Sequence, residues 1–257
     1  MKEEKQKIQN SIIKKYRKEI WRSFIKGIEE YELVSDGDKI AVCISGGKDS
    51  FLLAKCMEEL QIHGKMKFEL CFILMDPGYK DNHKELILKN ADILDINLHI
   101  FNSNIFDVIK GEKDICYLCA RKRRGALYSE AKKLGCNKIA LGHHFDDVVE
   151  TILMSMIYNG EFKTMMPKLS SVNFKPLELI RPLYYVREKD IISWANYNNL
   201  KFIDCACKVT EKQMGKRKEM KELIKLLNSY YKGADINIMN STKGVNLNTI
   251  ISYINKK

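Results

Sequence analysis

Residues 39–50 read KIAVCISGGKDS, and the expected fold follows from the pattern of these twelve residues. The mostly apolar run 39–44 follows a turn-forming SDGD cluster and is typical of a short buried strand. The small and polar residues SGGKDS come next, and the pattern of 51–60 is that of a helix. A strand, a glycine-rich loop and a helix in this order predict the first unit of a parallel α/β sheet.

The same alternation continues along the chain. It predicts three more strands and three more helices: strands at 68–75, 97–101 and 138–141, and helices at 82–94, 121–134 and 147–158. Asp147 and Glu150 have the spacing of a capping box at the start of the last of these helices. The predicted fold class is α/β, with a doubly wound and mainly parallel sheet. Polar segments at 45–50, 76–78 and 142–147 follow three strands, where ligands of such sheets bind.

Both ends of the chain are expected to be helical. A basic amphipathic helix is predicted within residues 1–35, and its apolar stripe recurs every four residues: Ile8, Ile12, Tyr16, Ile20, Phe24 and Ile28. After the α/β pattern ends, the expected elements are a loop at 164–182, helices at 186–198 and 211–231, and a helical turn at 246–254. Three domains follow from this pattern: a basic helical segment at 1–35, an α/β domain at 36–204 and a helical segment at 205–257.

Composition and charge narrow the class of protein. The 257 residues include 44 Lys and Arg against 33 Asp and Glu, a net charge of +11, and 45% of them are hydrophobic. These values exclude a disordered or collagen-like chain and favour a polyanionic partner, either nucleic acid or acidic lipid. The longest apolar run, 70–75, is far shorter than the ~18 residues of a membrane span, and the N-terminus has no apolar signal core. We therefore expect a cytoplasmic protein, without a membrane partner, whose thiols stay reduced.

The SGGKDS loop has the chemistry of a phosphate-binding site. Gly46 and Gly47 allow backbone N–H groups to turn inward, and the start of the following helix adds partial positive charge. Lys48 adds a full charge, while Ser45 and Ser50 offer hydroxyl groups. The spacing fits neither a Walker A loop nor the GxGxxG dinucleotide motif.

The eight cysteines fall into two groups. Cys116 and Cys119 form a C-x-x-C pair, and Cys205 and Cys207 form a C-x-C pair. Thiolates at such spacing bind zinc or an iron–sulfur cluster, and the spacing does not choose between them. The remaining four are interpreted as buried core residues: Cys43, Cys56, Cys71 and Cys136.

Several motifs together resemble one known family. The loop at 45–50 resembles the SGGxDS signature of the PP-loop ATP pyrophosphatases, which bind ATP and transfer AMP onto a carbonyl oxygen. Four further segments narrow the resemblance to the tRNA 2-thiocytidine synthetases: CYLC at 116–119 followed by RKRRG at 121–125, ALGHHFDD at 140–147, MPKL at 166–169 and IRPL at 180–183. The likeness covers most of residues 10–210.

The resemblance implies a set of cofactors and ligands. It implies a [4Fe–4S] cluster on three cysteines, Cys116, Cys119 and one of the later pair, with an open iron that holds sulfide. The family pattern has C-x-x-C at this place, and its first cysteine is the ligand, so Cys205 is the expected third ligand. Because this chain has C-x-C there, Cys207 is the alternative. The rest of the implied site consists of ATP on residues 45–50, including Asp49, with Met75, Gly142 and His143 beside it, and Mg²⁺ on Asp146 or Asp147. The implied partners are tRNA, a sulfur donor (a cysteine desulfurase or free sulfide) and a second copy in a homodimer.

The resulting hypothesis is an ATP-dependent tRNA thiolase. It would adenylate the C2 carbonyl of a tRNA pyrimidine, with cytidine as the expected base, and replace the oxygen by sulfur. The alternatives are thiolation of a uridine, a ligase similar to lysidine synthetase with structural zinc, and a non-catalytic metal-stapled RNA-binding protein. Basic stretches at 121–124 and 208–221 flank the cysteine pairs and favour RNA over membrane.

Overall fold

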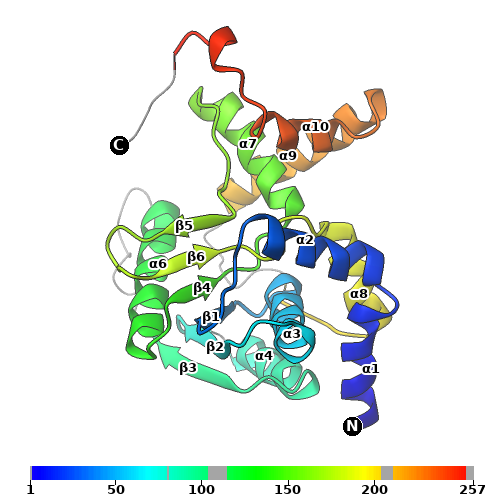
Figure 1. Cartoon of the computed structure of the whole chain (residues 1–257), viewed down its shortest axis with the longest axis vertical. Coiled ribbons are helices and arrows are strands. Elements are labelled where there is room, and N and C mark those ends of the chain that lie inside the picture. Colours follow the sequence, from blue (N-terminus) through cyan, green and yellow to red (C-terminus); the bar gives the residue numbers. More distant parts are fainter. Residues whose placement is uncertain (1, 80, 104–114, 204–210, 253–257) are drawn as a thin grey trace. The chain divides into compact units, whose positions relative to one another are not determined.

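The computed structural model describes residues 2–79, 81–103, 115–203 and 211–252 (Figure 1). The chain divides into two compact units. The first consists of Met1–Phe145 and Met166–Glu211, and the second of Asp146–Met165 and Lys212–Lys257. The three domains expected from the sequence stay a prediction.

A six-stranded sheet organises the first unit. Its strands are β1 (Lys39–Ile44), β2 (Glu69–Asp76), β3 (Leu98–Asn102), β4 (Lys138–Ala140), β5 (Lys168–Ser170) and β6 (Glu178–Ile180). They lie in the order β3-β2-β1-β4-β6-β5, and every neighbouring pair is parallel except β5 with β6. This confirms the predicted doubly wound, mainly parallel α/β fold, in which β1 lies at the centre beside β2 and β4.

Helices cover both faces of the sheet. Among the described residues of the first unit, the helices after β1 are α3 (Lys48–His63), α4 (Asp81–Ile93), α6 (Ile115–Lys133) and α8 (Glu188–Tyr197). Side chains alternate along β1, so Val42 packs in the same core as Phe51 of α3, while Cys43 packs in a second core with Tyr128 of α6. Figure 1 shows α3 and α6 on opposite sides of the strands. Burial on both faces explains why β1 is apolar along nearly its whole length.

The N-terminal segment forms three helical pieces and not one helix. They are α1 (Lys2–Ile13), the π-helical turn η1 (Arg17–Trp21) and α2 (Arg22–Glu30). All six residues of the predicted apolar stripe are buried. A stripe that recurs every four residues drifts around an α-helix of 3.6 residues per turn, and the wider turn of η1 compensates for that drift.

Two further local predictions were wrong. The expected loop at 164–182 contains the hairpin β5–β6, whose strands have only three residues each and depend on pairing with β4. The helix α7 (Phe145–Asn159) begins before Asp147, so this residue lies inside the first turn and does not cap the helix. The predicted capping box with Glu150 is therefore absent.

The described part of the second unit contains helices and no strand. It contains most of α7 together with α9 (Glu211–Tyr230), α10 (Ala234–Ser241) and the short 3-10 turn η3 (Leu247–Thr249). The helix α10 was not predicted. In the described residues of the whole chain, no helix is both long enough and apolar enough to cross a membrane.

Candidate active site

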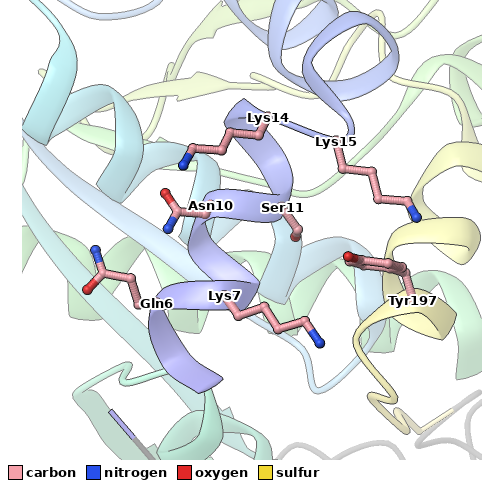
Figure 2. Close-up of a pocket in the computed structure, with 7 residues that line it drawn as sticks. All are labelled: Gln6, Lys7, Asn10, Ser11, Lys14, Lys15 and Tyr197. Carbon is pink, nitrogen blue, oxygen red and sulfur yellow. The ribbon is translucent and has the colours of Figure 1, made fainter. Parts of the chain in front are cut away.

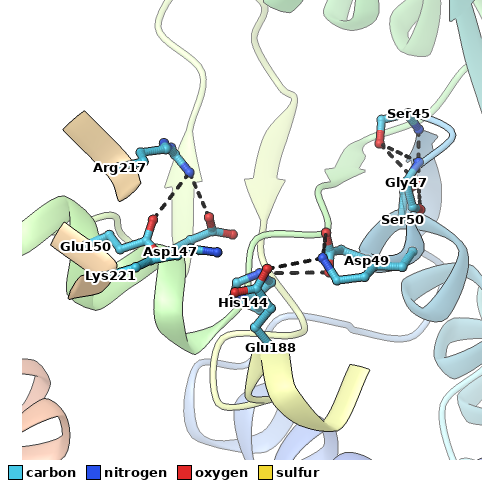
Figure 3. A network of polar contacts seen from close by, with 11 residues as sticks. Ser45, Gly47, Asp49, Ser50, His144, Asp147, Glu150, Glu188, Arg217 and Lys221 are labelled. Carbon is cyan, nitrogen blue, oxygen red and sulfur yellow. Dashed lines mark hydrogen bonds and ion pairs between the residues drawn. The ribbon is translucent and has the colours of Figure 1, made fainter. Parts of the chain in front are cut away.

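The predicted phosphate loop forms a closed set of hydrogen bonds at the carboxyl end of β1 (Figure 3). The Ser45 N–H donates to Ser50 Oγ at 3.1 Å, and the Ser50 hydroxyl donates to the Gly47 carbonyl at 2.8 Å. The Gly47 N–H in turn donates to Ser45 Oγ at 3.4 Å. These bonds fix the loop at the point where α3 begins, and the first N–H groups of a helix have no acceptor within it. The arrangement is therefore suited to binding an anion.

Position 46 favours glycine for two reasons, its backbone conformation and the closeness of its neighbours. Its φ is +87°, a left-handed conformation that side chains disfavour. A Cβ atom there would lie 2.7 Å from Ile87 Cγ1 and 2.7 Å from Ile203 Cδ1. Ile87 and Ile203 are both remote from Gly46 in the sequence, so the core beneath the loop limits what can occupy this position.

The loop after β4 lies directly on the first turn of α3. A Cβ atom on Gly142 would come within 3.1 Å of the backbone of Asp49 and Ser50, so the two segments meet backbone to backbone. His144 is buried, and its Nε2 lies 3.8 Å from Asp49 Oδ1. His143 is half-buried beside it. The structure thus brings together the SGGKDS and GHH segments, which are almost a hundred residues apart.

Lys48 lies in a compensated electrostatic environment. Its Nζ is 3.3 Å from Asp49 Oδ1 and 3.2 Å from Glu188 Oε1 in the first turn of α8. Burial by itself lowers the pKa of Lys48, but the two carboxylates outweigh burial and hold the pKa above its ordinary value. The lysine is therefore charged at neutral pH and ready to neutralise a phosphate.

Two acidic residues of this site were not among the predicted site residues. Glu188 belongs to no motif, and only the fold brings it to Lys48. Asp76, at the end of β2, accepts hydrogen bonds from the N–H groups of Gly78 and Tyr79 at 2.9 Å, and its Oδ2 lies 2.9 Å from Lys84 Nζ. Burial raises the pKa of Asp76, and these bonds overcome that effect and lower it. The DPG sequence after an apolar strand was the available signal for such a turn.

The other predicted ATP contact, Met75, is the residue before Asp76 in β2. It is buried, and it lies one position beyond the pairing of Leu74 with Ile44 at the end of β1. This places it near the carboxyl ends of the central strands, and its contact with the nucleotide stays a prediction.

The cysteines predicted to bind a cluster are only partly covered by the structure. Cys116 and Cys119 lie in α6, three residues apart, and their side chains are outside the described residues, as are Cys205 and Cys207 altogether. Their ligand role stays a prediction. Of the four remaining cysteines three are buried and Cys71 is partly exposed. Burial is the main cause that raises the pKa of Cys136 to about 12.

The second unit contains its own group of opposite charges (Figure 3). Arg217 of α9 lies 2.9 Å from Asp147 Oδ1 and 3.8 Å from Glu150 Oε2, and Lys221 Nζ lies 3.8 Å from Glu150 Oε1. Part of the second basic stretch is therefore neutralised by carboxylates within the unit. The predicted binding of Mg²⁺ by Asp146 or Asp147 stays a prediction.

Comparison with known proteins places these observations in context. A family model described as a PP-loop domain matches residues 14–213. The tRNA-cytidine(32) 2-sulfurtransferase of Geobacter metallireducens is 38% identical over 218 residues, covering 83% of this chain and 84% of that protein. The protein of the same name from Alcanivorax borkumensis is 35% identical over 92% of this chain and 82% of its own length.

A solved structure shares the fold. It is a U34-tRNA thiolase from Methanococcus maripaludis with its [4Fe–4S] cluster, 21% identical to this chain, with a TM-score of 0.69. The alignment covers 86% of this chain and 76% of that one. At this level of identity the likeness is one of fold.

Proposed function

The chain belongs to the PP-loop family, within the group of tRNA-cytidine(32) 2-sulfurtransferases, and on this premise we propose that it is an ATP-dependent tRNA thiolase. It would replace the C2 oxygen of the cytidine at position 32 by sulfur, as the name of its relatives indicates. The observation that carries the proposal is the meeting of the SGGKDS loop with Gly142 at the start of α3, since this builds an anion site from two of the family's motifs.

ATP would bind with its phosphates at this loop. The N–H groups at the start of α3 and the hydroxyl of Ser45 would hold the β- and γ-phosphates, and Lys48 would neutralise charge on the departing pyrophosphate. Gly142 and His143 would line the other side, and Met75 would contact the adenine. Glu188 and Asp49 hold Lys48 in place before ATP arrives.

The reaction then needs an accessible base and a sulfur nucleophile. The cytidine must leave its stack, because its C2 carbonyl cannot be reached inside one. The carbonyl oxygen attacks the α-phosphorus of ATP, the bond to the β-phosphate oxygen breaks, and pyrophosphate departs. Sulfide then attacks C2, the C2–O bond breaks, and AMP leaves with that oxygen. In both steps the protein would orient the base and exclude water.

A [4Fe–4S] cluster fits the donor set of the chain. Three thiolates are available from Cys116 and Cys119 of α6 and from Cys205, with Cys207 as the alternative. When bound, the cluster would supply an iron that holds the sulfur donor. The proposal further includes Mg²⁺ on Asp146 or Asp147, a cysteine desulfurase or free sulfide as the source of sulfur, a homodimer and a cytoplasmic location.

The deciding experiment is anaerobic thiolation of tRNA. The full-length chain, with its cluster reconstituted, is incubated with ATP, Mg²⁺, sulfide and unmodified tRNA, and the nucleosides are analysed by mass spectrometry. We expect 2-thiocytidine at position 32. A 2-thiouridine product would change the assigned base, and an amine adduct would change the reaction class. Release of no pyrophosphate in the presence of tRNA would overturn the enzyme assignment.

Cysteine variants separate thiolation from adenylation. Cys119→Ser should abolish 2-thiocytidine formation, whereas tRNA-dependent release of pyrophosphate continues, because the phosphate loop does not use this thiol. Cys71→Ser is the matched control, since Cys71 lies in β2 and is partly exposed. Iron analysis and visible absorption of the anaerobic protein accompany the assay. A colourless protein with one tightly bound zinc would contradict the cluster.

A further inference from the structure

The first unit has a groove whose lining residues have no role in the proposed reaction (Figure 2). It is open, has a volume of about 610 Å³ and lies between α1 and the end of α8. Its lining consists of polar and basic residues of α1 and the segment after it, with one aromatic ring from α8: Gln6, Lys7, Asn10, Ser11, Lys14, Lys15 and Tyr197. Among the residues that line it there is no carboxylate and no aliphatic side chain.

The floor of the groove is fixed by hydrogen bonds between its two walls. Trp194 Nε1 and Asn198 Nδ2 donate to the Ser11 hydroxyl at 3.1 and 3.2 Å. The Tyr16 hydroxyl donates to the carbonyl of Ser193 at 2.9 Å. Because Ser11 is buried together with the apolar stripe of α1, the groove keeps its shape without a ligand.

Two lysines of the groove converge on one ring. Lys15 Nζ lies 3.6 Å from the centroid of the Tyr197 ring, and Lys7 Nζ lies 5.9 Å from it. Figure 2 shows both side chains directed toward Tyr197, whereas Lys14 points to the other side of α1. Lys7 and Lys15 are two turns apart on the same side of the helical segment, and the aromatic face holds them there by cation–π attraction.

Within the part of the chain that the structure describes, neither Lys7 nor Lys15 has an ion-pair partner, whereas Lys5 on the same helix pairs with Asp95 at 2.8 Å. A second hollow, on η1 and α2, differs because acidic residues line it beside the basic ones: Arg17, Arg22 and Lys26 with Glu29 and Glu30. The charged residues that line the groove on α1 are thus all basic.

We propose that this groove binds phosphate groups of the tRNA backbone, an inference that rests on the proposed function. Lys7 and Lys15 would contact phosphate oxygens on the side of α1 that faces Tyr197. A protein partner would bury aliphatic side chains, and none is among the residues that line this groove, whereas a polyanion needs only the charge and the donors. Tyr197 positions Lys15 in advance, so less side-chain freedom is lost on binding.

The test measures tRNA binding as a function of salt. Wild-type protein is compared with Lys7→Gln/Lys15→Gln and with the control Lys65→Gln/Lys67→Gln, which removes the same charge in the loop before the amino end of β2. Affinity for unmodified tRNA is determined between 50 and 200 mM KCl, about the range over which phosphate contacts weaken. The groove variant should bind about tenfold more weakly at 150 mM, and the slope of log K against log salt should fall by about two.

The control should keep the slope of the wild-type protein. A second pair of variants tests the ring: Tyr197→Phe should bind like wild type and Tyr197→Ala should lose affinity, because only the former keeps the face that holds Lys15. Thermal unfolding of every variant checks that the fold persists.

The possible failures are distinguishable. If wild type binds and thiolates tRNA and the groove variant binds equally well with the same slope, the groove inference is wrong and the proposed function stands. If wild type binds no tRNA, both are wrong. Binding of poly-glutamate tests whether the groove instead binds an acidic protein. If the groove variant loses poly-glutamate binding while its tRNA binding is unchanged, the surface belongs to an acidic protein and the inference is overturned.

Discussion

Lys48 in the phosphate loop and Lys15 in the α1 groove are both basic residues of the first unit, and their surroundings are opposite. Lys48 is mostly shielded and lies within 3.3 Å of carboxylate oxygens of Asp49 and Glu188. Lys15 is exposed, has an aromatic ring beneath it and has no carboxylate among the residues that line its groove. One positive charge is already compensated, whereas the other is open to solvent.

The two lysines are suited to different tasks. A partly buried lysine that is paired with carboxylates contributes little to the electrostatic potential far from the protein. It occupies a fixed position, however, from which it can stabilise the negative charge that develops on a reacting phosphate. Exposed and unbalanced lysines attract a polyanion over about a Debye length, and salt screens that attraction. The net charge of +11 is therefore made up of basic residues in different electrostatic environments, and it does not correspond to a single basic surface.

The largest effect that would test this contrast is expected from Lys48→Ala. We expect tRNA-dependent release of pyrophosphate to fall about a hundredfold or more, because the charge on the departing group loses its fixed counter-ion. The affinity for tRNA and its salt slope should stay within twofold of wild type. Release is measured with a coupled pyrophosphate assay, and binding as for the groove variants. A large change in the salt slope with unchanged release would reverse the roles assigned to the two sites.

The sequence contains most of the information for the phosphate loop and little for what surrounds it. The apolar run of β1, the glycines and the start of α3 are contiguous, so local pattern suffices to predict them. Glu188 reaches Lys48 from 140 residues away, and no local pattern signals such a contact.

The errors in the fold have the same origin. The strands β5 and β6 are too short to show alternation, and β6 exists through its parallel pairing with β4. In the N-terminal segment the spacing of apolar residues predicted burial correctly, whereas the break into α1, η1 and α2 follows from packing against the body of the unit.

A smaller effect is expected from Gly46→Ala, which tests whether the phosphate loop is held rigidly by its core. The new Cβ would meet Ile87 and Ile203 at 2.7 Å, in a residue with φ of +87°. We expect the free energy of unfolding to fall by about 2–4 kcal/mol, from backbone strain together with overpacking. Denaturant titration measures the change.

Gly37→Ala is the matched control for that variant. Gly37 also has a positive φ, +79°, but a Cβ there would have no atom within 4 Å. Its cost should be limited to strain, about 1 kcal/mol. Equal losses in the two variants would show that contact with the core does not constrain the loop.

The smallest effect concerns pH, and it tests the compensation of Lys48 directly. Burial lowers the pKa of Lys48, but Asp49 and Glu188 raise it by more, so the net pKa lies above the ordinary 10.5. The lysine therefore keeps its charge until the pH rises above that value. Its favourable interactions are therefore fully present below the unfolded-state pKa and are lost only in strong alkali. We expect the affinity of wild type for ATP to change less than twofold between pH 7.5 and 9.5.

Glu188→Gln removes one of the two carboxylates that oppose burial. The pKa of Lys48 should fall in this variant, and its affinity for ATP should begin to decline at a lower pH than in wild type. Glu85→Gln, an exposed change in α4, is the control and should follow wild type. Calorimetric titration of ATP across this pH range measures the difference. Identical profiles for the two variants would mean that Asp49 alone holds the charge of Lys48, and the contrast with Lys15 would then rest on one carboxylate.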